Sequence, residues 1–496
     1  MVNYYQPHQT NTGDKVNKDG LLTGVMYTAL AKYSGIVISL VVTAILARLI
    51  SPEEFGIIAV ASIFMNFFST LTTVGIAPAI VQNKSLTKDD LKSINTFTIY
   101  ISFILSLVFI LCVPLIASYY DNDIQLKTVL YILSISITTS IAAIVPNALL
   151  MKSKKFKFIA MRTFWIQVSM GIVSCFCAYM GMGIYALLIN PVAGNILLLI
   201  VNYIKEPVEV SWRWNNISVK KILGFSIYQM LFNLVYLLYR NIDKILIGKH
   251  MSMQTLGYYE KSYRLMLLPL ENISTVINPV LHPVLSDYQN DTNYLWNAYL
   301  KMIKLLGEIG FYVTVVLYFS APTIIRVIYG DSWEPAIPMF RILSLSVCFQ
   351  IMQAPIGAIL QSINKVKGLL YSSLFILFFI TLSIFLSISY DNIILFCYLL
   401  TSSFVLGFFV YQFFLLYFFK RKLTDLLKAI TPAFIANLLL FLILAVMNVY
   451  KPINDTLYGF CLFTIIAILY ELFMIRQGYM PALRDLTRTL IKKIKK

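Results

Sequence analysis

The sequence predicts an all-α membrane protein with about fourteen transmembrane helices. Of its 496 residues, 59% are hydrophobic and only 13% are charged, and the mean hydropathy is +0.76. A soluble globular protein carries about a quarter charged residues, so this composition excludes one. Apolar stretches of about twenty residues recur along the chain, and each is long enough to cross about 30 Å of hydrocarbon.

These apolar stretches define the expected spans in order. Short polar connections separate them, none longer than about twenty residues, which leaves no extramembrane domain to house soluble chemistry. The spans are expected at residues 24–48, 55–81, 94–119, 124–151, 158–180, 183–203, 219–249, 256–285, 303–327, 333–360, 368–390, 393–419, 428–449 and 457–476.

The positive charges predict how the chain is oriented. Most of the 40 Lys and Arg residues fall in segments on the N-terminal side of the membrane, as the positive-inside rule requires for an even number of spans. The net charge of +17 therefore reflects topology and not nucleic-acid binding. We expect a multi-pass protein of the bacterial inner membrane with both termini in the cytoplasm.

The C-terminal tail has a pattern of its own. Leu483, Leu486, Leu490 and Ile494 share one helical face, surrounded by Lys and Arg residues. The tail is expected either to lie as an amphipathic helix on anionic lipid or to be a frayed basic end.

An internal repeat divides the chain. The segment 47–56 matches 248–257 at an offset of 201 residues, and 131–136 matches 341–346 at an offset of 210. Transporters are often built from such duplicated bundles. The predicted parts are a cytoplasmic segment 1–22, an N-lobe 23–210 with spans one to six, a C-lobe 211–422 with spans seven to twelve, spans thirteen and fourteen in 423–478, and the basic tail 479–496.

Four motifs carry a resemblance to a known family. They are Leu49-Ile-Ser-Pro-Glu-Glu-Phe-Gly56, Val74-Gly-Ile-Ala-Pro-Ala-Ile-Val-Gln82, Arg240-Asn-Ile-Asp-Lys-Ile-Leu-Ile-Gly248 running into Leu256-Gly-Tyr-Tyr259, and Gly330-Asp-Ser-Trp-Glu-Pro-Ala336. Within the first, Ser51, Pro52 and Glu54 also predict a capping box that opens a helix. Together the motifs resemble Wzx-type flippases of the multidrug/oligosaccharidyl-lipid/polysaccharide superfamily, in the branch of the teichuronic-acid and colanic-acid exporters.

The resemblance implies a fold and an activity. Members have two six-helix lobes around a central cavity, plus two further helices. They move undecaprenyl-diphosphate-linked oligosaccharides from the cytoplasmic to the periplasmic leaflet. Expected partners are therefore the lipid-linked oligosaccharide, membrane lipids, a polysaccharide polymerase and glycosyltransferases.

Charged residues at membrane depth are candidates for the site, because their cost means that they usually face a cavity. Polar residues recur at helical spacing in the seventh and eighth spans, and cations there would stabilise a diphosphate. The candidate substrate-binding residues are Lys32, Asn233, Arg240, Lys244, Arg264 and Arg341, and the candidates for ion coupling are Asp243, Glu260, Glu271 and Glu308. No phosphate loop, metal-ligand cluster or nucleophile elbow is present, so we expect no metal and no cofactor.

Two questions about these residues stay open at the level of sequence. Lys32 pairs with Asn233 through the repeat, which favours the cavity, but it could also snorkel to the interface. The charges of the stripes could bind substrate, or they could satisfy one another as ion pairs, with Arg240 on Asp243 and Glu260 on Arg264.

Other function classes explain the sequence less well. A cation-coupled multidrug exporter of the same fold needs a buried carboxylate, and the first-lobe spans contain none in their interiors. A membrane enzyme such as a polymerase needs a sizeable external loop, which is missing. A lipid II flippase is the nearest alternative, and only the motifs disfavour it.

Overall fold

The computed structural model describes residues 18–219, 237, 240–286, 288–289, 291–363, 366–450 and 457–494, and within these ranges it contains helices and no strand. The chain forms two compact units. Unit 1 comprises Met1–Val42, Phe64–Ile116 and Lys127–Val235, and unit 2 comprises Thr43–Ile63, Ala117–Leu126 and Tyr236–Lys496. One end of each of the first four helices, within 43–63 and 117–126, thus belongs to the same compact unit as the second half of the chain. The predicted lobe boundary at residue 210 stays a prediction.

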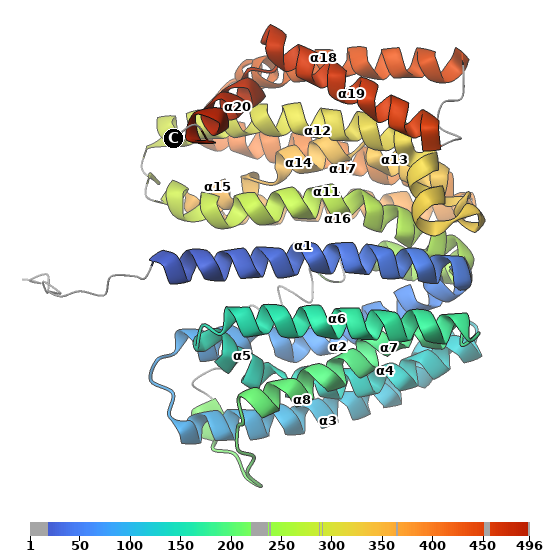
Figure 1. The fold of residues 1–496 in the computed structure, drawn as a ribbon, viewed down its shortest axis with the longest axis vertical. Helices are drawn as coiled ribbons and strands as arrows, with labels where there is room; N and C mark the ends of the chain where they lie inside the picture. The colour runs from blue at the N-terminus through green and yellow to red at the C-terminus, as the bar shows by residue number, and fades with distance from the viewer. Residues whose placement is uncertain are drawn as a thin grey trace, which may run out of the picture. The chain divides into compact units, whose positions relative to one another are not determined.

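The first half of the chain is a series of long helices with one irregular span (Figure 1). Its elements are α1 (Lys18–Leu49), α2 (Pro52–Gln82), α3 (Lys88–Tyr119), α4 (Ile124–Ala142), α5 (Ile144–Lys152), α6 (Phe156–Tyr179), α7 (Ile184–Ile189), the π-helical η1 (Asn190–Gly194) and α8 (Asn195–Lys205). Pro191 removes a backbone donor at η1, which explains why the ladder of α7 and α8 changes register there.

The second half continues with helices of more varied length. Its elements are α10 (Ile242–His250), α11 (Met253–Ser286), α12 (Thr292–Tyr329), η2 (Asp331–Trp333), α13 (Ala336–Ser344), α14 (Val347–Gln353), α15 (Ile356–Ser362), α16 (Val366–Ser389), α17 (Ile393–Phe419), α18 (Leu423–Tyr450), α19 (Leu457–Gln477) and α20 (Pro481–Ile494).

The helical membrane fold is confirmed. Among the described residues, eleven helices are long and apolar enough to cross a membrane, or twelve if the bent pair α13 and α14–α15 is one span. The predicted count of fourteen is not confirmed and stays a prediction. Most of the predicted seventh span, 219–249, lies outside the described residues. The predicted eighth span is the helix α11, which is not among these eleven.

The two halves of the chain break their helices at equivalent places. In the first half α5 starts after its N-cap residue Ala143, and in the second half α14 ends at Gln353, which the repeat offset of 210 pairs with Ala143. The predicted tenth span, 333–360, also bends by 44° at a different place, between α13 and α14, so it is not one straight helix. The repeat inferred from short matches therefore has a counterpart in backbone geometry.

Helix α12 organises the packing of unit 2. It contacts α13, α14, α18 and α19, and α18 runs beside it (Figure 1). A buried apolar cluster of Val315, Phe319, Leu440, Leu444 and Phe463 joins α12 to α18 and α19. The two helices that follow the repeat are therefore anchored on the ninth predicted span.

Candidate functional site

Three of the four sequence motifs meet at one end of unit 2. Helix α2 begins at the capping box, where the Ser51 amide donates to Glu54 Oε2 at 3.0 Å and the Glu54 amide to Ser51 Oγ at 3.3 Å. This predicted box is confirmed. The start of α2 packs directly on the start of α11, where a Cβ on Gly56 would lie 1.9 Å from the backbone oxygen of Met253. Only glycine permits backbones to approach so closely.

The close contact between α2 and α11 is reciprocal, and it joins residues that the repeat relates to each other. A Cβ on Gly257 would lie 1.9 Å from the backbone oxygen of Pro52, and the offset of 201 residues exchanges Gly56 with Gly257 and Pro52 with Met253. Repeat-related backbones therefore face each other across a local two-fold axis. This axis passes through the two motifs.

Two further pairs of contacts surround the glycines. Arg48 Nη2 donates to Val327 O at 2.6 Å at the end of α12, and its repeat partner Lys249 pairs with Asp121 at 2.7 Å just past the end of α3. Trp333 Nε1 donates to Ala47 O at 2.8 Å, while Tyr120 OH donates to Ile245 O at 3.0 Å. We call the set Arg48, Gly56, Tyr120, Lys249, Gly257 and Trp333 the clasp.

Buried charges between α10 and α11 form a second feature of unit 2. Lys244 Nζ lies 2.7 Å from Glu260 Oε2 and 5.3 Å from the ring centre of Tyr263. Asp243, buried, accepts a hydrogen bond of 2.5 Å from the buried Tyr259 hydroxyl, and its Oδ1 is buried with no partner within the described residues. Low dielectric surroundings make such contacts strong and their loss costly.

The pairing differs from the ion pair considered from sequence. Glu260 is engaged by Lys244 from the neighbouring helix and not by Arg264 one turn along α11. Arg264 is exposed and, within the described part of the chain, makes no hydrogen bond or ion pair. It is therefore the candidate cation on α11 that remains available to a ligand.

Arg341 and Lys261 each lie against an aromatic ring. The guanidinium of Arg341, on α13, lies 5.8 Å from the ring centre of Tyr318, and its Nε is buried with no partner in the described part of the chain. Lys261 Nζ lies only 4.1 Å from the ring centre of Phe55. Lys261 was not among the predicted site residues, since it falls off the polar stripe of α11 and its aromatic partner comes from a distant helix.

Glu308 has a structural contact that the sequence did not indicate. Its carboxylate, 1% exposed, accepts from the backbone amides of Ala482 at 3.1 Å and Leu483 at 2.7 Å, at the start of α20. A carboxylate at this position satisfies orphan amides and complements the helix dipole. Glu308 thus ties the C-terminal helix to α12, and ion coupling by this residue stays a hypothesis.

The other described candidates lie on three separate segments, and one of them reaches this cluster: Arg240 forms a side-chain hydrogen bond with Tyr263, whose ring Lys244 also faces. Lys32 is exposed on the part of α1 that belongs to unit 1, and Glu271 is exposed on α11. Arg240 is half-buried just before α10. Asn233 lies outside the described residues.

A buried arginine in unit 1 also escaped the prediction of site residues. Arg162 on α6 donates to Asn202 on α8 and, at 3.3 Å, to Asn147 on α5. Arg162 is 8% exposed and Asn202 is fully buried. Arg162 follows a run of lysines in the sequence, a pattern typical of a topology signal, and only the packing of three helices around it shows that it is internal.

Residues 45–338 match the family model described as "Polysaccharide biosynthesis protein", which is more than half of the chain. The chain belongs to this family. The expected family resemblance is confirmed, and the match begins and ends inside unit 2, at the clasp residues of α1 and at α13.

Curated relatives of this polysaccharide biosynthesis protein come from several bacteria. It is 20% identical over 423 residues to the teichuronic acid biosynthesis protein TuaB of Bacillus subtilis, covering 84% of this chain and 86% of the relative. It is 21% identical over 355 residues to the lipopolysaccharide biosynthesis protein WzxC of Escherichia coli, covering 70% and 71%. An uncharacterized membrane protein in the cps region of Klebsiella pneumoniae is 24% identical over 357 residues, covering 69% and 71%.

Solved structures with the same fold are transporters. A lipid II flippase MurJ in an inward closed conformation superposes with a TM-score of 0.73 at 17% identity, covering 93% of this chain and 100% of that one. An inward-facing multidrug resistance MATE family transporter of the MOP superfamily gives 0.57 at 15% identity, covering 76% and 94%. At these identities the likeness establishes the fold of this polysaccharide biosynthesis protein.

Proposed function

We propose that this protein is a flippase that moves a lipid-linked oligosaccharide, carried on undecaprenyl diphosphate, from the cytoplasmic to the outer leaflet. It acts in the bacterial cytoplasmic membrane with both termini inside and has no enzymatic role. Family membership and the names of the relatives in cell-surface polysaccharide biosynthesis support this substrate class. The transporter fold supports movement across a membrane.

The observation that carries the proposal is the exposure of the Arg264 guanidinium. Its neighbour Glu260 is occupied by Lys244, so the guanidinium of Arg264 is exposed on a membrane helix with no internal counter-charge in the described residues. An exposed cation at such a position is costly without a partner. A diphosphate supplies that partner through charge-assisted hydrogen bonds.

The test is transport by reconstituted Arg264→Gln. Charge-assisted hydrogen bonds of about 1.5–3 kcal/mol correspond to about tenfold or more in affinity. Uptake of a fluorescent lipid-linked oligosaccharide into the distal leaflet of proteoliposomes should therefore require a correspondingly higher substrate density. Lys428→Gln removes an equally exposed cation from α18 and should leave transport unchanged. Equal transport by both variants would remove Arg264 from the site.

Lys32, Asn233, Arg240, Lys244 and Arg341 remain further proposed contacts for the substrate. Their neutralised variants belong in the same assay, with Lys32→Gln first, because a snorkelling lysine would tolerate this change. Export would then be followed by polymerisation, so a polymerase and glycosyltransferases are the proposed partners.

A second candidate function rests on Asp243. Its buried Oδ1 lacks a partner within the described residues, and a buried carboxylate is the group that a cation-coupled exporter needs. The discriminating measurement is transport of a cationic dye under an imposed proton or sodium gradient. Gradient-driven dye transport that Asp243→Asn abolishes would favour a multidrug exporter, whereas oligosaccharide transport without dye transport favours the flippase.

A further inference from the structure

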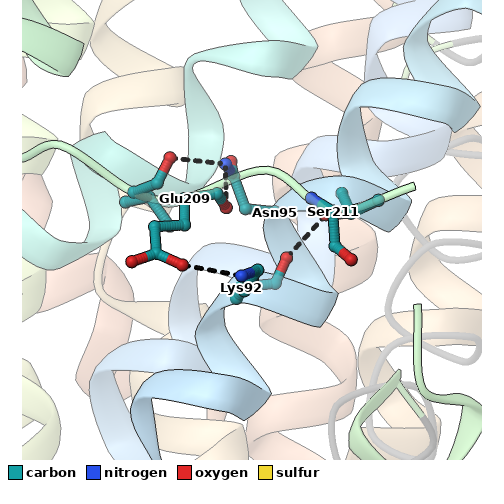
Figure 2. Close-up of polar contacts among 6 residues, drawn as sticks. Lys92, Asn95, Glu209 and Ser211 are labelled. Atoms are coloured by element: carbon teal, nitrogen blue, oxygen red, sulfur yellow. Dashed lines mark hydrogen bonds and ion pairs between the residues drawn. The ribbon is translucent and has the colours of Figure 1, made fainter. Parts of the chain in front are cut away.

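The segment between α8 and the next helix is fastened along α3. Lys92 pairs with Glu209 at 2.7 Å, and Asn95 Nδ2 donates to the backbone oxygens of Val208 and Glu209 at 3.4 and 3.5 Å. The Ser211 amide donates to Thr96 Oγ1 at 3.0 Å (Figure 2). We call residues 206–215 the linker.

The fastening continues past the linker. Ser218 Oγ donates to the buried Asp90 carboxylate at 2.6 Å, and at the start of the linker Glu206 forms an ion pair with Lys155. Asp90, Lys92, Asn95 and Thr96 all lie in the first three turns of α3. The linker is therefore held at both ends and along its length against unit 1.

Helix α3 marks where hydrocarbon begins on this side of unit 1. Its first eleven residues, 88–98, are largely polar, whereas 99–118 contain no charged residue and span about 30 Å, the thickness of a bilayer core. Exposed apolar side chains then follow at helical spacing along one face, namely Tyr100, Phe103, Ile104, Leu107, Leu111 and Leu115. This stripe is the lipid-facing surface of α3, and Tyr100 is its first residue.

The linker crosses α3 at the head of that stripe. The ring of Trp214 lies 5.5 Å from Tyr100 and 5.9 Å from Phe97, and the Tyr100 hydroxyl lies 3.5 Å from Trp212 O. These contacts cover one side of the linker. Other side chains here are exposed: Trp212 is 92% exposed, Val210 55% and, just past the linker, Ile217 68%.

We propose that the linker is an interfacial anchor of unit 1, with the Trp212 indole inserted among phospholipid headgroups at the level where the lipid-facing stripe of α3 begins. Trp is the residue best suited to this layer, since its ring is apolar and its N–H is polar. Arg213 beside it carries the charge that phosphate groups attract. The partner is the bilayer surface, and the hydrogen bonds to α3 set the depth at which the indole sits.

The argument favours lipid over a soluble partner because of position. Trp212 lies at the end of an exposed apolar stripe, because its backbone oxygen is 3.5 Å from the hydroxyl of Tyr100, the first residue of that stripe. An apolar patch that projected into water would instead stand clear of the stripe.

The experiment measures the depth of Trp212 in the full-length protein. The chain has five tryptophans, so the Trp212 signal is the emission of the parent protein minus that of Trp212→Phe, both in lipid vesicles. Phospholipids brominated near the headgroup should quench this signal more than those brominated near the chain ends, and aqueous iodide should quench it little. Trp165→Phe is the matched control, because Trp165 is 59% exposed but lies further along a membrane helix, α6, and should respond more to deep bromines.

Two results would overturn the proposal. Strong quenching of the Trp212 signal by iodide with none by brominated lipid would place the indole in water, where it could meet only a soluble partner. Equal response of Trp212 and Trp165 to deep bromines would place it in the hydrocarbon. The variant Asn95→Ala, which removes both amide hydrogen bonds, adds a test of positioning: the Trp212 signal should gain iodide quenching while the Trp165 signal does not change.

Discussion

Gly56 and Gly257 face each other at the starts of α2 and α11, and each occupies the position at which any side chain would strike the other helix. A Cβ on either glycine would lie 1.9 Å from a backbone oxygen of the opposite helix, Met253 O for Gly56 and Pro52 O for Gly257. The two residues are also partners in the sequence repeat. The two copies of the repeat therefore contact each other at equivalent residues at this point.

Replacing either glycine by alanine should loosen the clasp. Because the obstructing atoms are backbone, the helices must move apart, and we expect Gly56→Ala or Gly257→Ala to cost about 1–3 kcal/mol. The check is the thermal midpoint of the purified protein. Gly357→Ala is the control, since no atom lies within 4 Å of a Cβ there, and it should be neutral or stabilising. A midpoint for Gly56→Ala that matches this control would contradict the close packing.

The two cations of the clasp should differ in their contribution to stability. Arg48 donates to the backbone oxygens of Ala44, Val327 and Ile328, and Arg48→Gln leaves carbonyls at the end of α12 unsatisfied, at about 1–3 kcal/mol. Lys249→Gln breaks an ion pair whose Asp121 carboxylate is 83% exposed, which costs about 0–1 kcal/mol. Denaturant titration of both variants measures the difference. Equal losses in the free energy of unfolding would show that Arg48 and Lys249 contribute equally to stability.

The pair of Lys244 and Glu260 should respond to exchange of its charges. Each single variant, Lys244→Gln or Glu260→Gln, leaves a poorly solvated charge and should cost about 3 kcal/mol. Lys244→Glu with Glu260→Lys should recover most of this, as a double-mutant cycle will show. If the exchanged protein is stable but does not transport, the pair contributes to the site as well as to the fold. No recovery of stability would mean that another neighbour fixes the charge at one position.

Removing the charge of Glu308 should release α20. Glu308→Gln weakens two charge-assisted hydrogen bonds, so the backbone amides of Ala482 and Leu483 should exchange hydrogen at least several-fold faster. Glu471→Gln is the comparison variant: Glu471 is also nearly buried and lies close enough to Glu308 to repel its charge, but its Oε2 has no partner among the described residues. Its variant should leave exchange in α20 unchanged. Identical exchange in both variants would show that apolar packing alone holds the helix.

Acid should weaken the hold of the linker on α3. The Lys92 ammonium beside Glu209 keeps the pKa of that carboxyl below its usual range. A carboxyl with a lowered folded-state pKa contributes stability above its ordinary pKa and loses it as the pH falls through the folded-state value. Hydrogen exchange of the linker should therefore rise at strongly acidic pH, and less so in Glu209→Gln, which has already lost the pair. Because Glu209 is 79% exposed and Lys92 is 36% exposed, salt should produce part of the same effect at neutral pH.

Local features of the fold followed directly from the sequence. The long apolar stretches required membrane helices, and the Ser51 capping box required a helix start, because both depend on neighbours within a few residues. Short matches at two offsets predicted a repeat, and the division of the chain into two lobes stays a prediction. The family motifs could also be recognised in the sequence. The sequence did not show why they contain glycines and aromatic residues at these positions.

Tertiary structure alone decided which side chains meet. From the sequence Glu260 and Arg264 are a plausible pair, since residues four apart on a helix are neighbours, but α10 brings Lys244 to the same carboxylate from outside that helix. In the same way, the sequence offers no partner for Glu308 in its membrane span. In the structure its carboxylate accepts a hydrogen bond from the start of α20, more than 170 residues further along the chain. Spacing along the chain determines the faces of a helix, whereas the partner of a buried charge depends on which distant helix packs against that face.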